Sequence, residues 1–124
     1  MTLSVISGDY GWGTAKIFLL DVDAQHANAL ANRLRSGRLH VDVSVDPDGA
    51  VAQLRRKDAE YEIVIVNISA PSFSWLKTLQ KLNEVCRLSG ARHQPLFLCV
   101  STNQQQPEFV LQIERTGARY VRER

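Results

Sequence analysis

Cysteines, prolines and long apolar runs are all scarce in this chain, and each shortage excludes a class of protein. Among 124 residues there are only two cysteines, Cys86 and Cys99, which lie far apart and match no metal-ligand spacing. They fit reduced thiols better than a disulfide scaffold. Four prolines and seven glycines exclude a collagen-like chain. No apolar run approaches the roughly 20 residues that cross a bilayer, so we expect no membrane insertion.

Net charge is also small, at +2, but it is unevenly distributed. Residues 1–62 hold nine acidic and seven basic side chains, whereas residues 63–124 hold four acidic and eight basic ones. The isoelectric point near 8.7 lies below the range typical of dedicated nucleic-acid binders, so nucleic acid is not the favoured partner. The N-terminus has neither the basic cluster nor the apolar core of a secretory signal, and we therefore expect a cytoplasmic protein.

Residues 1–15 form a separate N-terminal arm in this interpretation. Three glycines, Tyr10 and Trp12 fall within residues 8–13. The glycines come before a predicted strand and no GK[ST] sequence follows them, so a phosphate-binding loop is not indicated. Glycine at this density is typical of turns or of a packing arm.

From Lys16 onward, apolar runs alternate with segments of helical periodicity. Strands are predicted at residues 16–23, 40–45, 61–69, 95–100 and 118–124, separated by helices after Asp23, after Asp46, from about Ser74 to Cys86, and from Phe109 to Thr116. This order predicts a parallel sheet with right-handed crossovers. Ligands of such sheets bind beyond the carboxyl ends of the strands. Residues there include Asp21, Asp46, Asn67, Ser101 and Arg122.

The chain resembles the receiver domain of two-component response regulators from Lys16 to its end. The resemblance depends on KIFLLDVD, YEIVIVNISAP followed by SFSWLKTLQKL, PLFLCVST and TGARYV. It implies an α/β, flavodoxin-like, three-layer sandwich with five parallel strands in the order 2-1-3-4-5. The family's fifth helix is missing from the sequence as it stands. Either the chain is part of a longer protein, or residues 1–15 cover that flank of the sheet.

The residues at the strand ends depart from the family's phosphorylation pattern. The resemblance implies a pair of acids at strand 1 that bind Mg²⁺, an aspartate at strand 3, a threonine or serine at strand 4 and a lysine at strand 5. Here the corresponding residues are Asp21 and Val22, Asn67, Val100 with Ser101 next to it, and Glu123 (or Arg124 without a gap). An amide cannot replace the carboxylate nucleophile, so we expect a degenerate phosphorylation pocket with no metal and no cofactor.

Several of these residues permit two interpretations. Asn67 either fixes one signalling state or simply caps a strand end, and Asp21 with Asp23 either holds a cation or caps the next helix. Trp75, beside Phe73, either faces a partner or packs on the sheet. With Tyr120, these two aromatic residues form our candidate partner surface. We expect His26 and His93 to face solvent.

We predict a non-enzymatic, non-phosphorylatable signalling module that acts through a histidine kinase, a response regulator, an output domain or a second copy of itself. One alternative is the N-terminal atypical receiver of a longer protein, such as a localisation ATPase of pilus assembly or secretion. Another is a small-ligand or nucleotide binder at the carboxyl-end crevice. Ser101 and Thr102 have no histidine placed to activate them, so a hydrolase is not indicated.

Overall fold

The computed structural model describes residues 15–56, 60–70, 74–88 and 94–123. The predicted N-terminal arm therefore lies, except for Ala15, outside the described residues. The elements alternate as predicted: β1 (Lys16–Leu20), α1 (Ala24–Ser36), β2 (His40–Ser44), α2 (Pro47–Leu54), β3 (Ile63–Asn67), α3 (Trp75–Leu88), β4 (Leu96–Ser101), α4 (Pro107–Arg115) and β5 (Arg119–Arg122). Helix α4 begins two residues before the predicted Phe109, because Pro107 takes a first-turn position that suits proline.

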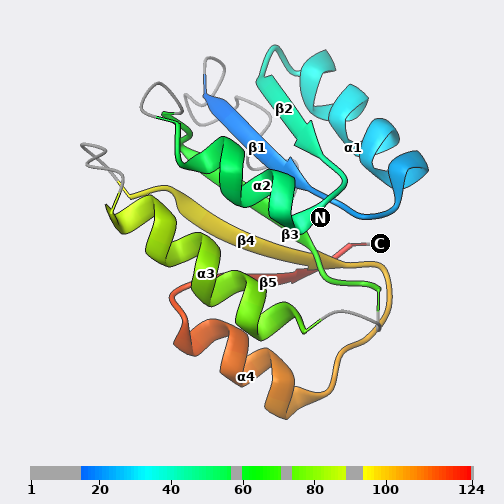
Figure 1. The fold of residues 1–124 in the computed structure, drawn as a ribbon. Helices are drawn as coiled ribbons and strands as arrows, with labels where there is room; N and C mark the ends of the chain where they lie inside the picture. The colour runs from blue at the N-terminus through cyan, green and yellow to red at the C-terminus, as the bar shows by residue number, and fades with distance from the viewer. Residues whose placement is uncertain (1–14, 57–59, 71–73, 89–93, 124) are drawn as a thin grey trace.

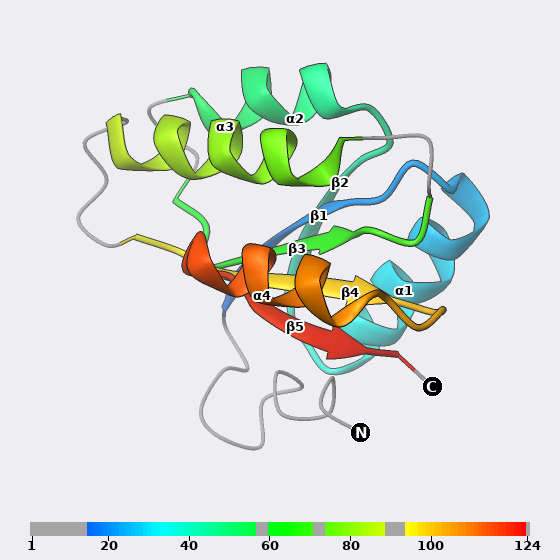
Figure 2. The ribbon, with the colours of Figure 1, turned by 90° about the horizontal axis from the view of Figure 1, so that it is seen from below.

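The five strands form one parallel sheet in the order β2-β1-β3-β4-β5, which confirms the predicted fold class. Helices α2, α3 and α4 pack on one face, and of the described helices α1 alone lies on the other (Figure 1 and Figure 2). All strands run in the same direction, so their carboxyl ends meet at a single edge of the sheet.

Alternation along the central strands divides the core into two halves. On β3, Val64 and Val66 belong to the cluster under α2, α3 and α4, whereas Ile63 and Ile65 belong to the cluster on the α1 side. All four side chains are fully buried. A strand buried on both faces is apolar throughout, which is why this segment carries the strongest strand pattern in the sequence.

Polar caps fix where the helices begin. The carboxylate of Asp23 accepts hydrogen bonds from the backbone amides of Gln25 and His26, and that of Asp46 accepts one from Gly49. Asp23 thus serves as the predicted helix cap. At the end of α4, Gly117 has a φ of 96°, a conformation that glycine adopts without strain. This turn starts β5 and so positions Tyr120 and Glu123.

Candidate functional site: the carboxyl-end crevice

The sheet brings the predicted pocket residues to one edge. Asn67 pairs with Val100 in the register of β3 and β4, and the amide of Glu123 donates to the carbonyl of Ser101 at 2.7 Å. Asp21 follows β1 and is fully buried. Val22, the other residue of the predicted set, is partly buried and packs against the core under α2 and α3. The apolar side chain of Val100 is fully buried as well.

Asn67 is held in place by local hydrogen bonds. Its Oδ1 accepts from the backbone amide of Ser69 at 3.0 Å and from the Ser69 hydroxyl at 2.6 Å. The Ser69 hydroxyl also accepts from the amide of Thr102 at 2.9 Å. The Asn67 carbonyl oxygen is therefore already engaged, and the side chain links the loops after β3 and β4. This arrangement fits the interpretation of Asn67 as a cap of the strand end.

His26 is the main correction to the sequence analysis, which expected it to face solvent. Its side chain is only 20% exposed and lies between two carboxylates. Nδ1 contacts Oδ2 of Asp21, and Nε2 lies 2.8 Å from Oε2 of Glu123. Its helix starts beside the crevice, so the first turn directs the ring over the strand ends. The other predicted solvent-facing histidine, His93, lies outside the described residues.

The charges around His26 come from separate elements. Asp21 follows β1, and Glu123 follows β5 and is 7% exposed. Arg33, two turns along α1, donates to Oε1 of Glu123 at 3.2 Å. Burial lowers the pKa of His26, but its hydrogen bonds to Asp21 and Glu123 and their negative charges outweigh that effect, so the pKa is raised above 6.5.

The residues present do not fit the magnesium ion that the resemblance implies. Oδ1 of Asp21 accepts a hydrogen bond from the amide of Asp23, and Oδ2 faces His26. The side chain of Val22 offers no oxygen, and the carbonyl oxygen of the Asn67 side chain is engaged by Ser69. Within the described ranges, no group of three or more histidine, cysteine, aspartate or glutamate side chains could hold a metal ion.

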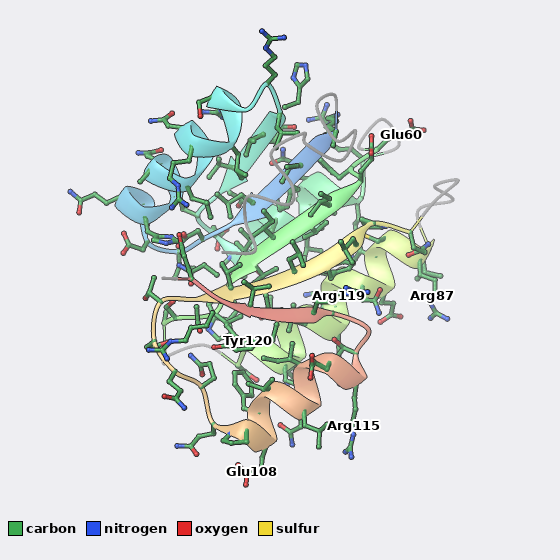
Figure 3. The ribbon with its side chains drawn as sticks, turned by 180° about the vertical axis from the view of Figure 1, so that it is seen from behind. Glu60, Arg87, Glu108, Arg115, Arg119 and Tyr120 are labelled. Carbon is green, nitrogen blue, oxygen red and sulfur yellow. The ribbon has the colours of Figure 1, made fainter. Side chains whose placement is uncertain are left out.

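Ser101 links the end of β4 to Tyr120 on β5. The Ser101 hydroxyl is buried, donates to the carbonyl of Asn103 at 2.6 Å and lies 2.6 Å from the Tyr120 hydroxyl. Tyr120 is partly buried and sits beside α4 (Figure 3). Its hydroxyl is thus turned inward, which leaves only part of this side chain for the partner surface that we predicted from the sequence.

Trp75 does not face a partner. It is 3% exposed, belongs to the core under α2 and α3, and donates its indole N–H to the carbonyl of Ala70 at 2.8 Å. The interpretation of Trp75 as an exposed contact residue is therefore wrong. The alternative, in which Trp75 packs on the sheet, is the arrangement found. Phe73, the third residue of the predicted surface, lies outside the described residues.

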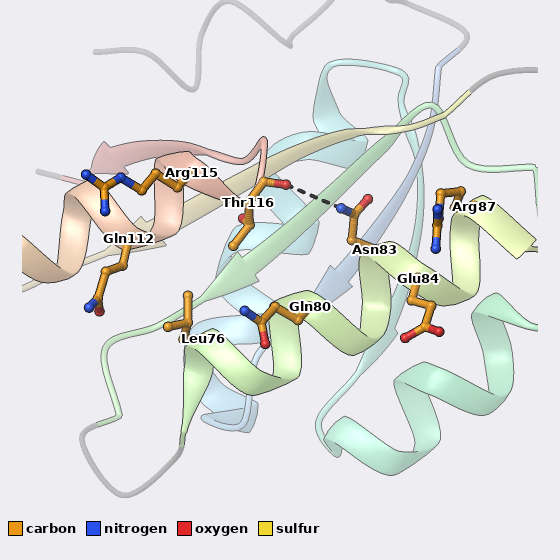
Figure 4. Close-up of a pocket in the computed structure, with 8 residues that line it drawn as sticks. All are labelled: Leu76, Gln80, Asn83, Glu84, Arg87, Gln112, Arg115 and Thr116. Atoms are coloured by element: carbon orange, nitrogen blue, oxygen red, sulfur yellow. Dashed lines mark hydrogen bonds between the residues drawn. The ribbon is translucent and has the colours of Figure 1, made fainter.

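Two hollows of the surface differ in their relation to the crevice. The larger, about 700 Å³, lies between α3 and α4 and contains none of the predicted pocket residues. Figure 4 shows polar side chains along it, with Arg115 and Arg87 at opposite ends. The smaller, about 480 Å³, lies over the crevice and is lined by His26, Thr102, Arg122 and Glu123. Sequence reasoning missed the α3–α4 hollow because its lining comes from exposed helix positions that carry no motif.

The sequence matches no protein-family model and no curated protein. Many solved structures share the fold. A Burkholderia pseudomallei protein described as pilus assembly-related has 23% identity and a TM-score of 0.69, covering 91% of this chain and 81% of that one. A two-component response regulator from Clostridium difficile has 14% identity and a TM-score of 0.72, covering 89% and 84%. The receiver domain of the histidine kinase CKI1 from Arabidopsis thaliana, complexed with Mg²⁺ and BeF₃⁻, has 11% identity and a TM-score of 0.71, covering 87% and 80%.

These neighbours share the fold of this chain over most of its length. Two of the three are a response regulator and a receiver domain by name. No described helix is both long and apolar enough to cross a membrane. This chain therefore has the fold of response-regulator receiver domains.

Proposed function

We propose that this chain is a receiver-like signalling module that accepts no phosphoryl group, catalyses no reaction and acts in the cytoplasm by protein contact. Its partner would be a histidine kinase, a response regulator, an output domain or a second copy of the chain. The receiver fold supports the signalling class. The chemistry of the crevice supports the departure from phosphorylation.

The side chain of Asn67 carries this proposal. Transfer of a phosphoryl group to the residue at the end of strand 3 requires a carboxylate oxygen that can attack phosphorus. Asn67 ends β3 with an amide whose only oxygen accepts two hydrogen bonds from Ser69. An amide oxygen carries no full negative charge and would have to leave both donors to attack. The position is therefore chemically unsuited to the reaction.

The negative charge of Glu123 in the same crevice supports the same conclusion. The resemblance puts a lysine after strand 5, where its positive charge would stabilise a phosphoryl group. Glu123 holds that place and directs its carboxylate at His26 and Arg33. An incoming dianion would meet a carboxylate already paired with His26 and Arg33 instead of a free ammonium group.

The direct test uses beryllofluoride, a phosphoryl mimic, with Mg²⁺ on the whole chain. We expect the amide NMR signals of Asn67, Ser69 and Thr102 to stay in place over the titration. A receiver that accepts phosphoryl groups serves as the positive control for the reagent. Saturable shifts at these three amides would refute the non-phosphorylatable part of the proposal.

The interaction part needs its own experiment, because an inert crevice does not by itself create a partner. Sedimentation of the purified chain over a range of concentrations measures self-association, and binding to purified kinase and regulator candidates measures hetero-association. We expect a saturable complex in one of these assays. A chain that stays monomeric and binds no kinase, regulator or output domain would contradict the interaction role.

One comparison favours a second candidate function. The neighbour described as pilus assembly-related covers 91% of this chain at 23% identity. This supports the alternative in which the chain is the atypical receiver part of a protein that localises pilus or secretion machinery. Imaging a fluorescent fusion tests it: accumulation at one site of the envelope that is lost when the assembly genes are deleted would favour this role, and uniform fluorescence would count against it.

A further inference from the structure

A histidine ring lies between two buried carboxylates at the point where the resemblance implies a metal cation. Nδ1 of His26 contacts Asp21, and Nε2 lies 2.8 Å from Glu123. The side chains of Asp21 and Glu123 are 0% and 7% exposed. Two carboxylates this deep in a protein need a positive charge between them, because buried charges are stable only when they are paired.

The geometry determines how many protons the cluster holds. An ionised carboxylate accepts hydrogen bonds and cannot donate them. Each ring nitrogen of His26 faces a carboxylate oxygen, and Nδ1 also lies 3.2 Å from Nδ2 of Asn67. The protonated ring, an imidazolium, donates to both carboxylates at once. With Arg33 on the second oxygen of Glu123, the group contains two negative and two positive charges. With the ring protonated, the cluster is electrically balanced without any added ion.

The same contacts join elements that are far apart in the sequence. His26 and Glu123 are 97 positions apart, and their hydrogen bond connects the first turn of α1 to the residue that follows β5. No backbone hydrogen bond joins α1 to β5 among those of the described residues. The side-chain cluster thus holds the end of β5 against α1.

We propose that His26 acts as a built-in cation that takes the place of the divalent metal ion of a receiver crevice and fastens the end of β5 to α1 in a pH-dependent manner. The misfit of magnesium described above follows from this arrangement, since the carboxylate oxygens that would bind the metal already face the ring. The inference concerns the same crevice as the proposed function but does not require a partner.

The direction of the pH dependence follows from the groups that surround the ring. Asp21 and Glu123 contact it directly, and the other charged groups nearby are Asp23 at the helix cap, Arg33 on α1 and Arg122, which lines the same hollow. The two contacting carboxylates raise the pKa of His26 above 6.5 despite its burial. The stability that the cluster contributes is complete below about pH 6.5, and it is lost as the pH rises through the higher pKa of His26 in the folded chain.

The first experiment is an NMR titration of the histidine ring nitrogens in the unmodified chain. His40 opens β2 and is exposed, so its signal serves as a control that Glu123→Gln should leave unchanged. We expect His26 to lose its proton above pH 6.5, and Glu123→Gln to lower the pH at which His26 titrates. Loss of the His26 proton below pH 6.5, or no response of His26 to Glu123→Gln, would overturn the proposal.

The second experiment measures unfolding by urea for His26→Gln and for the matched control His40→Gln. At about pH 6, His26→Gln should reduce the folding constant by roughly tenfold more than it does at about pH 9, whereas His40→Gln should have the same effect at both. Millimolar Mg²⁺ should leave the stability of the unmodified chain unchanged. Stabilisation by Mg²⁺, or a pH-independent effect of His26→Gln, would refute the built-in cation.

These outcomes are separable from those of the proposed function. A beryllofluoride response at Asn67 would refute the non-phosphorylatable part of the proposed function. The titration of His26 in the chain without beryllofluoride is a separate measurement, and its result would stand. Failure to find a partner leaves the titration result intact. If His26→Gln does not fold, the ring titration of the unmodified chain still decides the proposal.

Discussion

Replacing Trp75 tests its packing role, because truncating a core side chain destabilises the fold whereas truncating an exposed one does not. The side chain is 3% exposed and donates a hydrogen bond to the carbonyl of Ala70 at 2.8 Å. Truncation of a buried tryptophan to alanine costs about 3–5 kcal/mol. Trp75→Phe keeps an aromatic ring but removes the N–H donor, which costs about 1–3 kcal/mol if the carbonyl stays buried.

The assay is urea unfolding monitored by far-ultraviolet circular dichroism. A domain of this size has a free energy of unfolding of about 5–15 kcal/mol, so Trp75→Ala should remove a large part of it. The matched control is Leu88→Ala at the other end of the same helix, where the side chain is 72% exposed. We expect Leu88→Ala to change stability by less than about 0.5 kcal/mol. Equal stabilities of Trp75→Ala and Leu88→Ala would refute the packing argument.

Two further predictions concern titration of buried groups. Burial raises the pKa of the Cys86 thiol to about 11 and that of the Cys99 thiol to about 12. Neither thiol should therefore react with a thiol reagent at about pH 8 until urea unfolds the chain. Mass spectrometry measures the labelling, and rapid labelling of the folded chain would contradict this prediction. Burial and a 2.6 Å hydrogen bond to Asp42 raise the pKa of Tyr61 to about 12. The stability that this hydrogen bond provides should be present below about pH 10 and should be lost as the pH rises toward 12. Urea unfolding of Tyr61→Phe and of the unmodified chain, compared at increasing pH, measures this loss.

The fold could be predicted because local pattern and topology agree. The apolar segment around Ile63 and the capping residues Asp23 and Asp46 mark elements whose type does not depend on distant contacts. Strands alternating with helices then allow few arrangements of a parallel sheet. The strand order itself came from the family resemblance, since no pattern within the strands specifies which neighbours pair.

The crevice was predicted only in part. The sequence identified Asp21, Asn67, Ser101 and Glu123 because each stands at a strand end, and a parallel topology collects strand ends. It missed His26, because the contact with Glu123 spans 97 positions and a lone histidine in a first helical turn is usually exposed. The spacing of His26 and Arg33 was the available signal, since seven positions put two cationic side chains on one face of α1. The sequence did not decide whether Trp75 is buried, because a position at the start of a helix does not indicate whether the side chain faces the sheet or the solvent.

The two outer strands of the sheet have a consequence for how copies of the chain can meet. Strand β5 is four residues long and exposes Arg119 and Arg122, and β2 exposes His40 and Asp42. Charged side chains and short length are the features by which sheet proteins discourage strand-to-strand addition and fibril growth. The sheet is therefore poorly suited to extending itself from one molecule into the next. Within the described part of the chain, helical surfaces are better suited to self-association than the sheet edges, and concentrated solutions should resist cross-β aggregation.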